Sequence, residues 1–181
     1  MQEVLEQLKK SFGFNEFRPM QKEIVQTVLK QQDCLVLMPT GGGKSLCYQL
    51  PATVLPGVTI VVSPLIALMK DQVEGLVANG VPAGYINSSL EEHEQKEMGQ
   101  AVKNGEIKLL YVSPEKLVSP SFQNFLRQIT ISLFAIDEAH CISAWGHDFR
   151  KEYTQLRQLK NNFPEVPIIA LTATADKLTR K

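Results

Sequence analysis

Short apolar runs alternate along the chain with longer segments in which apolar positions recur at helical spacing. The runs expected to form strands cover residues 34–38, 58–62, 108–112, 133–136 and 168–171, with a weaker candidate at 83–86. Segments long enough for crossover helices lie between them at 65–79, 91–104, 122–129 and 152–162. Apolar runs without strict alternation are typical of parallel strands that are buried on both faces. The pattern therefore predicts a three-layer α/β/α domain with a mainly parallel central sheet.

Length and charge restrict the number of domains, the class of protein and the way in which nucleic acid could bind. A chain of 181 residues fits one domain. With 19 Lys and Arg against 19 Asp and Glu, the formal net charge is zero, and 44% of the residues are hydrophobic, as in an ordinary globular protein. Because no global basic field would attract a polyanion, any binding of nucleic acid must be local.

The sequence also suggests a cellular setting. We expect an intracellular, cytoplasmic protein without a membrane partner, associated with the nucleoid if the source is bacterial, because the chain has neither an apolar run of membrane-spanning length nor a signal-peptide pattern. Cys34, Cys47 and Cys141 do not stand at zinc-ligand spacing, so we expect reduced, packed thiols.

Two strand ends carry the dipeptide Ser-Pro, at Ser63-Pro64 and at Ser113-Pro114. In each, Ser is placed to cap a helix and Pro to occupy its first position. Two helix N-termini would then open at the carboxyl edge of the sheet, where open α/β sheets bind ligands. Simple helix capping, without any ligand, is the alternative.

A glycine-rich turn follows the first predicted strand and precedes a helical segment. Its three glycines allow successive N–H groups to point toward a phosphate, while Lys44 reaches the outer phosphates and Ser45 can ligate Mg²⁺. Met38 stands where the simplest phosphate-loop pattern has Gly, and a purely structural turn is the alternative. The loop residues assigned to nucleotide binding are Thr40, Gly41, Gly42, Gly43, Lys44 and Ser45.

Two acidic residues, Asp137 and Glu138, follow the buried run at 133–136. A nucleotide site needs a carboxylate at the end of a neighbouring strand to hold the metal ion that bridges the phosphates. We assign that role to Asp137, and we assign activation of the attacking water to Glu138. Lys44, Asp137 and Glu138 are thus candidate catalytic groups for hydrolysis of a nucleotide with Mg²⁺, and a solvated strand end is the alternative.

Residues 137–140, Asp-Glu-Ala-His, resemble the DEAH motif of superfamily 2 helicases, and their flanks resemble the RecQ family of DNA helicases over nearly the whole chain. The resemblance implies a RecA-like P-loop fold, and it implies that the nucleotide is ATP. Residues 12–21 are similar to the family's adenine-recognition motif, which implies that Phe14 and Arg18 flank the base and that Gln21 hydrogen-bonds its edge. Without the resemblance, Phe12, Phe14 and Phe17 would be taken as core residues of a helix-turn unit.

Residues 140–150 combine the only Trp with a Phe and an Arg directly after the acidic motif. Trp145 and Phe149 offer faces on which unpaired bases can stack, and Arg150 can meet a phosphate. The resemblance implies that this aromatic-rich loop senses DNA and signals to the ATP site. Aromatic packing of a helix against the core is the alternative, whereas metal binding by His140 and His147 is disfavoured because no second ligand cluster accompanies them.

The remaining assignments also come from the resemblance. Ser63 opens a motif that touches the DNA strand in the family, and Thr172 and Thr174 belong to a motif that couples hydrolysis to strand movement. His140, which we count with Lys44, Asp137 and Glu138 among the candidate catalytic residues, is expected to hydrogen-bond between the acidic site and that motif. A small polar turn with a capping Thr is the alternative for 172–174, and Ser89 with Glu92 fits a helix capping box.

These expectations combine into one function. Residues 1–181 would be the first of two RecA-like domains of an ATP-dependent helicase that translocates 3′ to 5′ on single-stranded DNA and unwinds partly duplex DNA in recombination and repair. The second domain, outside this sequence, would supply an arginine finger, so we expect the chain to fold, to bind ATP weakly and to hydrolyse it slowly. A nucleotide-switched binding module and an RNA-directed relative are the alternatives left open.

Overall fold

The computed structural model describes residues 2–18, 20–37, 44–137 and 158–172. The described helices are α1 (Gln2–Phe12), α2 (Gln21–Leu29), α3 (Leu46–Val54), α4 (Ile66–Ala78), α5 (Glu92–Lys103), α6 (Pro114–Leu117) and α7 (Pro120–Leu126), and residues 158–162 are also helical. The described strands are β1 (Cys34–Leu37), β2 (Val58–Val62), β3 (Ala83–Ile86), β4 (Leu109–Val112), β5 (Ile131–Ile136) and β6 (Ile168–Thr172).

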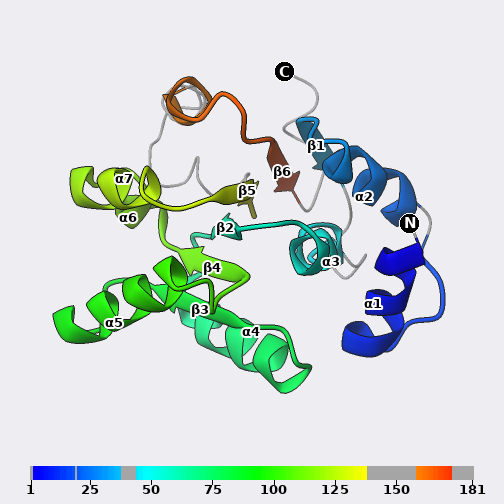
Figure 1. The fold of residues 1–181 in the computed structure, drawn as a ribbon, viewed down its shortest axis with the longest axis horizontal. Helices are drawn as coiled ribbons and strands as arrows, with labels where there is room; N and C mark the ends of the chain where they lie inside the picture. The colour runs from blue at the N-terminus through cyan, green and yellow to red at the C-terminus, as the bar shows by residue number, and fades with distance from the viewer. Residues whose placement is uncertain (1, 19, 38–43, 138–157, 173–181) are drawn as a thin grey trace.

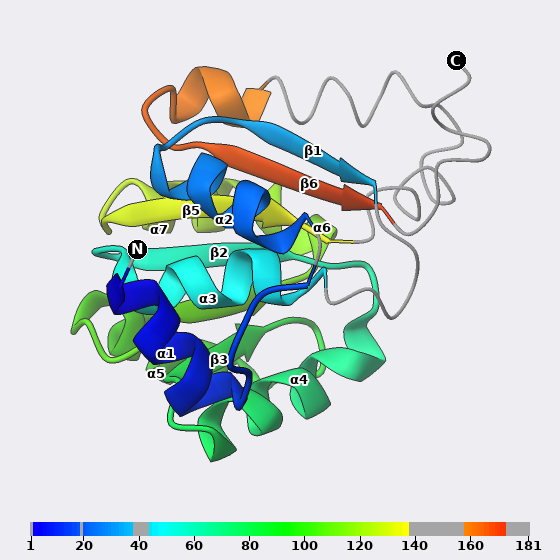
Figure 2. The ribbon, with the colours of Figure 1, turned by 90° about the vertical axis from the view of Figure 1, so that its right-hand side faces the viewer.

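The strands form one six-stranded sheet in the order β1-β6-β5-β2-β4-β3. Every neighbouring pair is parallel, and in Figure 2 the arrowheads of β1 and β6 accordingly point the same way. The carboxyl ends of β1, β5, β2 and β4 therefore meet at one edge, so residues that follow these strands are neighbours in space. The predicted parallel sheet is confirmed.

Alternate residues along the strands build two cores, one on each face of the sheet. On one face Val61, Tyr111 and Leu133 pack against helices α2, α3 and α4. On the other, residues such as Ile60 and Leu110 pack against α5, α6, α7 and the helical residues near Leu159. Figure 1 shows the two groups of helices on either side of the strands. The predicted three-layer α/β/α arrangement is confirmed.

Helix α1 lies outside these layers. Its buried residues Val4 and Leu8 pack against Val25 of α2 and Leu46 and Leu50 of α3. This third cluster places the end of α1 beside the start of α3. The segment that links α1 to α2 is consequently brought toward the residues that follow the glycine-rich turn.

The predicted strands agree with the observed ones to within two residues at each end, and 58–62 and 83–86 agree at both ends. The predicted helix at 122–129 is wrong in its bounds, because Pro120 begins α7 and Leu126 ends it. Of the predicted helix at 152–162, residues 158–162 are helical, and the remainder lies outside the described residues.

The two Ser-Pro dipeptides behave differently. Ser113 caps α6 as predicted, since its side chain accepts from Lys116 N and Pro114 is the first helical residue. The prediction for Ser63-Pro64 is wrong: α4 begins two residues later, after Leu65, and Ser63 Oγ instead accepts from Leu65 N at 3.2 Å. A local hydroxyl-to-backbone turn therefore competes with capping here.

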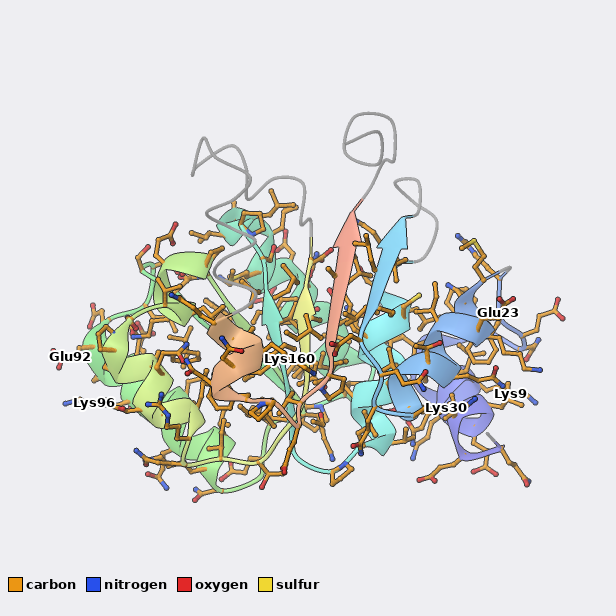
Figure 3. The ribbon with its side chains drawn as sticks, turned by 90° about the horizontal axis from the view of Figure 1, so that it is seen from above. Lys9, Glu23, Lys30, Glu92, Lys96 and Lys160 are labelled. Carbon is orange, nitrogen blue, oxygen red and sulfur yellow. The ribbon has the colours of Figure 1, made fainter. Side chains whose placement is uncertain are left out.

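The capping box at the start of α5 is also displaced from its predicted position. Glu91 is the N-cap, and its N–H donates to Glu94 Oε1 at 2.9 Å. Ser89 N instead donates to Asn87 Oδ1 at 2.8 Å in the preceding turn. The prediction from Ser89 and Glu92 is therefore wrong by two residues. The charged side chains of this helix, including Glu92 and Lys96, point outward on the opposite side of the molecule from α1 and α2 (Figure 3).

Among the described residues, no helix combines the length and apolar character needed to cross a bilayer.

Candidate functional site

The carboxyl edge of the sheet gathers the residues that follow four strands. The glycine-rich turn links β1 to Lys44, Asp137 follows β5, Ser63 follows β2 and Ser113 follows β4. Backbone hydrogen bonds continue the ladder by one residue, because Asp137 N donates to Val62 O at 2.9 Å and Ser63 N donates to Val112 O at 3.1 Å. The rigid sheet therefore fixes the backbone positions of Asp137 and Ser63.

Lys44 and Asp137 are brought together at this edge. Lys44 Nζ lies 3.7 Å from Asp137 Oδ1, and the exposed fractions of the two side chains are 12% and 6%. Water is largely excluded from this pair, so the attraction between the charges is screened less than at the surface. The juxtaposition that the sequence predicted between the glycine-rich turn and the acidic strand end is present.

A tyrosine supports the carboxylate from the other side. Tyr48 Oη donates to Asp137 Oδ2 at 3.1 Å, and it lies 3.5 Å from Tyr111 Oη. Burial raises the pKa of the Tyr48 hydroxyl well above its ordinary value; Tyr111 and Asp137 add to the rise, and hydrogen bonding by the Ser45 side chain partly offsets it. Tyr48 therefore remains a protonated donor toward Asp137 near neutral pH.

A cavity of about 330 Å³ opens beside Lys44. It is lined by Phe14, Glu16, Arg18, Gln21, Lys44, Ser45 and Leu46. The cavity thus joins the α1–α2 segment to the start of α3. It brings the residues predicted to recognise a base next to the residues predicted to bind phosphates.

The segment that forms one wall of this cavity has a defined geometry. Gly13, directly after α1, has a φ of +75°, and Met20, directly before α2, has a φ of 74°. Between them, Arg18 N donates to Gln21 Oε1 at 2.7 Å, and Gln21 is only 3% exposed. Gln21 therefore anchors the segment and lines the cavity with the same side chain.

The three phenylalanines of this segment divide into two groups. Phe12 and Phe17 pack against the core, in agreement with the structural alternative, but Phe14 is 47% exposed at the cavity. An exposed aromatic ring beside an exposed Arg18 offers two planar groups for stacking. Of the three rings, only Phe14 lines the cavity.

Ser63 lies at the predicted edge, but it is only 4% exposed and its hydroxyl supports the turn before α4. Thr172 ends β6 and pairs in register with Leu37 of β1, directly before the glycine-rich turn. The other predicted site residues lie outside the described part of the chain: Thr40, Gly41, Gly42, Gly43, Glu138, His140, Trp145, Phe149, Arg150 and Thr174.

The described residues contain no group of three or more His, Cys, Asp or Glu able to hold a metal ion by themselves. One carboxylate, Asp137, and one hydroxyl, Ser45, lie near Lys44. Mg²⁺ in nucleotide sites is held by one or two protein oxygens, with phosphate oxygens and water completing its coordination. This donor set fits Mg²⁺ that arrives with a nucleotide.

A larger cavity, of about 500 Å³, lies on another part of the surface, between α5 and α7. Phe122 and Phe125 form part of its lining, and three lysines, Lys96, Lys103 and Lys116, surround it. Lys116 Nζ donates to Gln95 Oε1, and Lys103 Nζ lies 5.8 Å from the centre of the Phe125 ring. None of the residues that approach Asp137 contributes to this cavity, so size alone does not locate the site.

Comparison with known families agrees with the geometry. The family model for DEAD/DEAH box helicases matches residues 18–181. The chain belongs to the DEAD/DEAH box helicase family. The match includes Lys44, Asp137 and the cavity residues from Arg18 onward, whereas Phe14 and Glu16 precede it.

Named relatives show which helicases within this family the chain resembles. The chain is 54% identical over 180 residues to the ATP-dependent DNA helicase RecQ of Pasteurella multocida, covering 99% of the chain and 28% of the relative. It is 53% identical over 178 residues to RecQ of Haemophilus influenzae, covering 98% of the chain and 29% of the relative. The predicted resemblance to the RecQ family is confirmed. The chain spans less than a third of the length of these relatives.

Solved structures confirm the fold. A hypothetical ATP-dependent RNA helicase from Sulfolobus tokodaii matches with a TM-score of 0.73 at 18% identity, covering 96% of this chain and 51% of that structure. At this identity the likeness concerns the fold alone. The predicted RecA-like fold is therefore confirmed for this DEAD/DEAH box chain.

The sequence analysis did not identify Tyr48, Gln49 and Tyr111 as parts of the site. Gln49 Nε2 donates to Tyr111 Oη at 2.9 Å, so the three side chains form a group behind Asp137. A signal was present, because Tyr48 follows Lys44 by one helical turn and Tyr111 is a polar residue within a buried apolar run. Either residue alone, however, looks like an ordinary core aromatic.

Proposed function

We propose that the chain is the first motor domain of an ATP-dependent DNA helicase of the RecQ type. One observation carries the proposal: Lys44 Nζ and Asp137 Oδ1 lie 3.7 Å apart beside a cavity that Phe14, Arg18 and Gln21 help to line. A phosphate-binding cation, a metal-binding carboxylate and groups able to recognise a base are thus adjacent. From the cavity toward Asp137, these groups follow one another in the same order as the base, the phosphates and the bound metal ion of a nucleotide.

In this proposal each described residue has one task. Phe14 and Arg18 stack against the adenine, and Gln21 hydrogen-bonds the edge of the base. Lys44 binds the outer phosphates, and the backbone N–H groups of residues 40–43 surround them. Lys44 faces Asp137 in this structure. Binding of ATP therefore requires Lys44 to exchange its carboxylate partner for phosphate oxygens.

Asp137 and Ser45 would hold Mg²⁺, which supplies charge neutralisation of the phosphates. Glu138, the next residue after Asp137, is proposed to orient and deprotonate the attacking water. A nucleotide-gated binding module would have no use for such a base, so Glu138 favours turnover over simple switching. The second RecA-like domain and its arginine finger are proposed to lie in a longer polypeptide, consistent with the greater length of the relatives.

Single-stranded DNA is proposed to lie across the carboxyl edge of the sheet, where Ser63 and Ser113 follow their strands. Trp145 and Phe149 would stack on bases, Arg150 would contact a phosphate, and His140, Thr172 and Thr174 would transmit the contact to Glu138. We propose 3′ to 5′ translocation and unwinding of partly duplex DNA in recombination and repair. Such a substrate places the protein with the chromosome, in the cytoplasm on the nucleoid if the host is bacterial.

The test uses the full protein, wild type and Trp145→Ala. ATP hydrolysis is measured alone, with single-stranded DNA and with single-stranded RNA of the same sequence. We expect stimulation by DNA in the wild type, and unchanged nucleotide affinity but reduced stimulation in Trp145→Ala. Stronger stimulation by RNA would favour an RNA-directed enzyme, and nucleotide-dependent DNA binding without turnover would favour a switch; either result contradicts the proposal.

A further inference from the structure

A connected group of polar side chains lies behind Asp137, inside the layer between the sheet and α3. Tyr48 and Gln49 come from α3, Tyr111 comes from β4, and Asp137 follows β5. Tyr48 is completely buried, as is Tyr111, and Asp137 is 4% exposed. Polar groups buried this deeply are costly unless their hydrogen bonds are satisfied, so the contacts among them constrain their positions.

The direction of each hydrogen bond follows from the chemistry of the groups. An ionised carboxylate only accepts, so the single proton of Tyr48 goes to Asp137 Oδ2, 3.1 Å away. Gln49 Nε2 donates to Tyr111 Oη at 2.9 Å. Tyr111 is then left to donate its own proton toward Tyr48 Oη, at the longer distance of 3.5 Å. Donation runs in one direction, from Gln49 through Tyr111 and Tyr48 to Asp137.

The two oxygens of Asp137 thus have different surroundings. Oδ2 is held by Tyr48, whereas Oδ1 faces Lys44 Nζ at 3.7 Å, and Lys44 in turn lines the cavity. A carboxylate held at one oxygen cannot rotate freely about its terminal torsion, which is otherwise broad. The group behind Asp137 therefore determines which oxygen faces Lys44.

We propose that Tyr48 is a positioning residue for the nucleotide-bound metal: its hydroxyl fixes Asp137 so that Oδ1 faces Mg²⁺, and Tyr111 and Gln49 hold that hydroxyl in place. The inference rests on the proposed function, because it takes Asp137 as the residue that meets Mg²⁺. Groups that orient a metal ligand from behind commonly change metal affinity when they are removed. In this proposal Tyr48 meets neither the nucleotide nor the metal itself and acts through Asp137, while its hydrogen bond with the Ser45 side chain links it to the second residue proposed to hold Mg²⁺.

The experiment compares the full wild-type protein with Tyr48→Phe, which keeps the buried ring and removes the hydroxyl. Binding of a fluorescent ADP analogue is titrated at increasing Mg²⁺ and, separately, with EDTA. We expect Tyr48→Phe to raise the Mg²⁺ concentration for half-maximal binding by about 10-fold. The affinity measured in EDTA should be unchanged, because the contacts to the base and phosphates are intact.

Two variants serve as comparisons. Tyr85→Phe is the matched control, since Tyr85 pairs in register with Tyr111 on the neighbouring strand and packs against the same core, and it should leave the Mg²⁺ requirement unchanged. Tyr111→Phe removes the hydroxyl that receives the Gln49 bond, and it should raise the requirement by less than Tyr48→Phe does. Thermal unfolding of each variant shows how much of any change is a loss of stability.

The results distinguish the positioning role of Tyr48 from the proposed nucleotide-binding function of the chain. An unchanged Mg²⁺ requirement in Tyr48→Phe, with Mg²⁺-dependent binding by the wild type, would overturn the positioning role and leave the proposed function intact. An equal loss of affinity with and without Mg²⁺ would show a purely structural role and would also overturn it. Absence of nucleotide binding by a folded wild-type protein would overturn the proposed function, and this inference with it.

Discussion

Lys44 Nζ and Asp137 Oδ1 lie 3.7 Å apart although their strands, β1 and β5, are separated in the sheet by β6. Lys44, which lies just before α3, nevertheless meets Asp137 at the carboxyl edge of the sheet. Because both side chains are largely buried, the opposite charges of the pair offset part of the cost of removing each from water. The same geometry places the cation where a bound phosphate can take the position of the carboxylate.

Replacement of Lys44 by Ala should lower the affinity for ATP. A charged hydrogen bond contributes about 1.5–3 kcal/mol, so we expect a decrease of about 10- to 100-fold in a titration with a fluorescent ATP analogue. Lys30→Ala is the control with the same change of charge, because Lys30 is exposed at the end of α2 (Figure 3). Equal affinities in the two variants would contradict the phosphate-binding role of Lys44.

Replacement of Gln21 by Ala should reduce discrimination between ATP and GTP. The amide of Gln21 offers a donor and an acceptor to a base edge, and its Oε1 also holds Arg18 N at 2.7 Å. We expect the affinity for ATP to fall by about 10-fold, because a hydrogen bond contributes about 1 kcal/mol and the wall formed by residues 13–18 is loosened as well. The affinity for GTP should change less.

The comparison for Gln21 is Gln26→Ala, a replacement of the same type farther along α2, outside the residues that line the cavity. Competition of each nucleotide against the fluorescent analogue gives the ratio of the two affinities. A ratio that is the same in Gln21→Ala, Gln26→Ala and the wild type would contradict base recognition by Gln21.

Burial of Cys47 should make the protein less stable at alkaline pH. Desolvation raises the pKa of this fully buried thiol to about 12 from an ordinary value near 9, with a further rise from Cys34. Because the folded-state pKa is raised, the protonated thiol supports folding fully below pH 9, and this support is lost as the pH rises toward 12. At pH 10 the loss should be about 1 kcal/mol.

Urea unfolding of the wild type and Cys47→Ala at pH 7 and pH 10 measures this loss. The difference in unfolding free energy between the two proteins should shrink by about 1 kcal/mol at the higher pH. Cys34 is present in both proteins, so its own raised pKa contributes to both curves. A difference that stays constant between the two pH values would show that Cys47 ionises as readily as in the unfolded chain.

The sequence was sufficient to predict the sheet because buried parallel strands have a strong and local signature. Val58–Val62 and Ala83–Ile86 were predicted at their observed ends. Lys44 and Asp137 could also be predicted as neighbours, because both follow strands of a parallel sheet and such ends share one edge. The prediction that Lys44 and Asp137 are neighbours thus depends on the sheet topology and not on any contact between side chains.

Other features depend on contacts that no local pattern specifies. Ser63-Pro64 and Ser113-Pro114 are the same dipeptide, but only Ser113 caps a helix, since Ser63 bonds its own turn. Tyr48 and Asp137 are 89 positions apart, and their hydrogen bond follows from how α3 packs on the sheet. Side-chain geometry between elements therefore had to come from the structure.

Two glycines with nearly the same φ allow backbone strain to be separated from steric overlap. Gly57 has a φ of +83° and Gly80 a φ of +86°, so Ala is strained at both positions. A Cβ at Gly57 would lie 2.5 Å from Thr130 O, which also accepts from Val58 N at the start of β2. A Cβ at Gly80, after α4, would meet no atom within 4 Å.

Gly80→Ala should therefore lower the free energy of unfolding by about 1–2 kcal/mol, which is the cost of the left-handed backbone alone. Gly57→Ala should lower it by about 2–5 kcal/mol, because the overlap with a backbone carbonyl adds about 1–3 kcal/mol. Urea unfolding of both variants at pH 7 measures the two values. Equal losses of unfolding free energy in the two variants would mean that the backbone near Gly57 and Thr130 moves apart with no energetic penalty. This contact would then not fix the register at the start of β2 and β5.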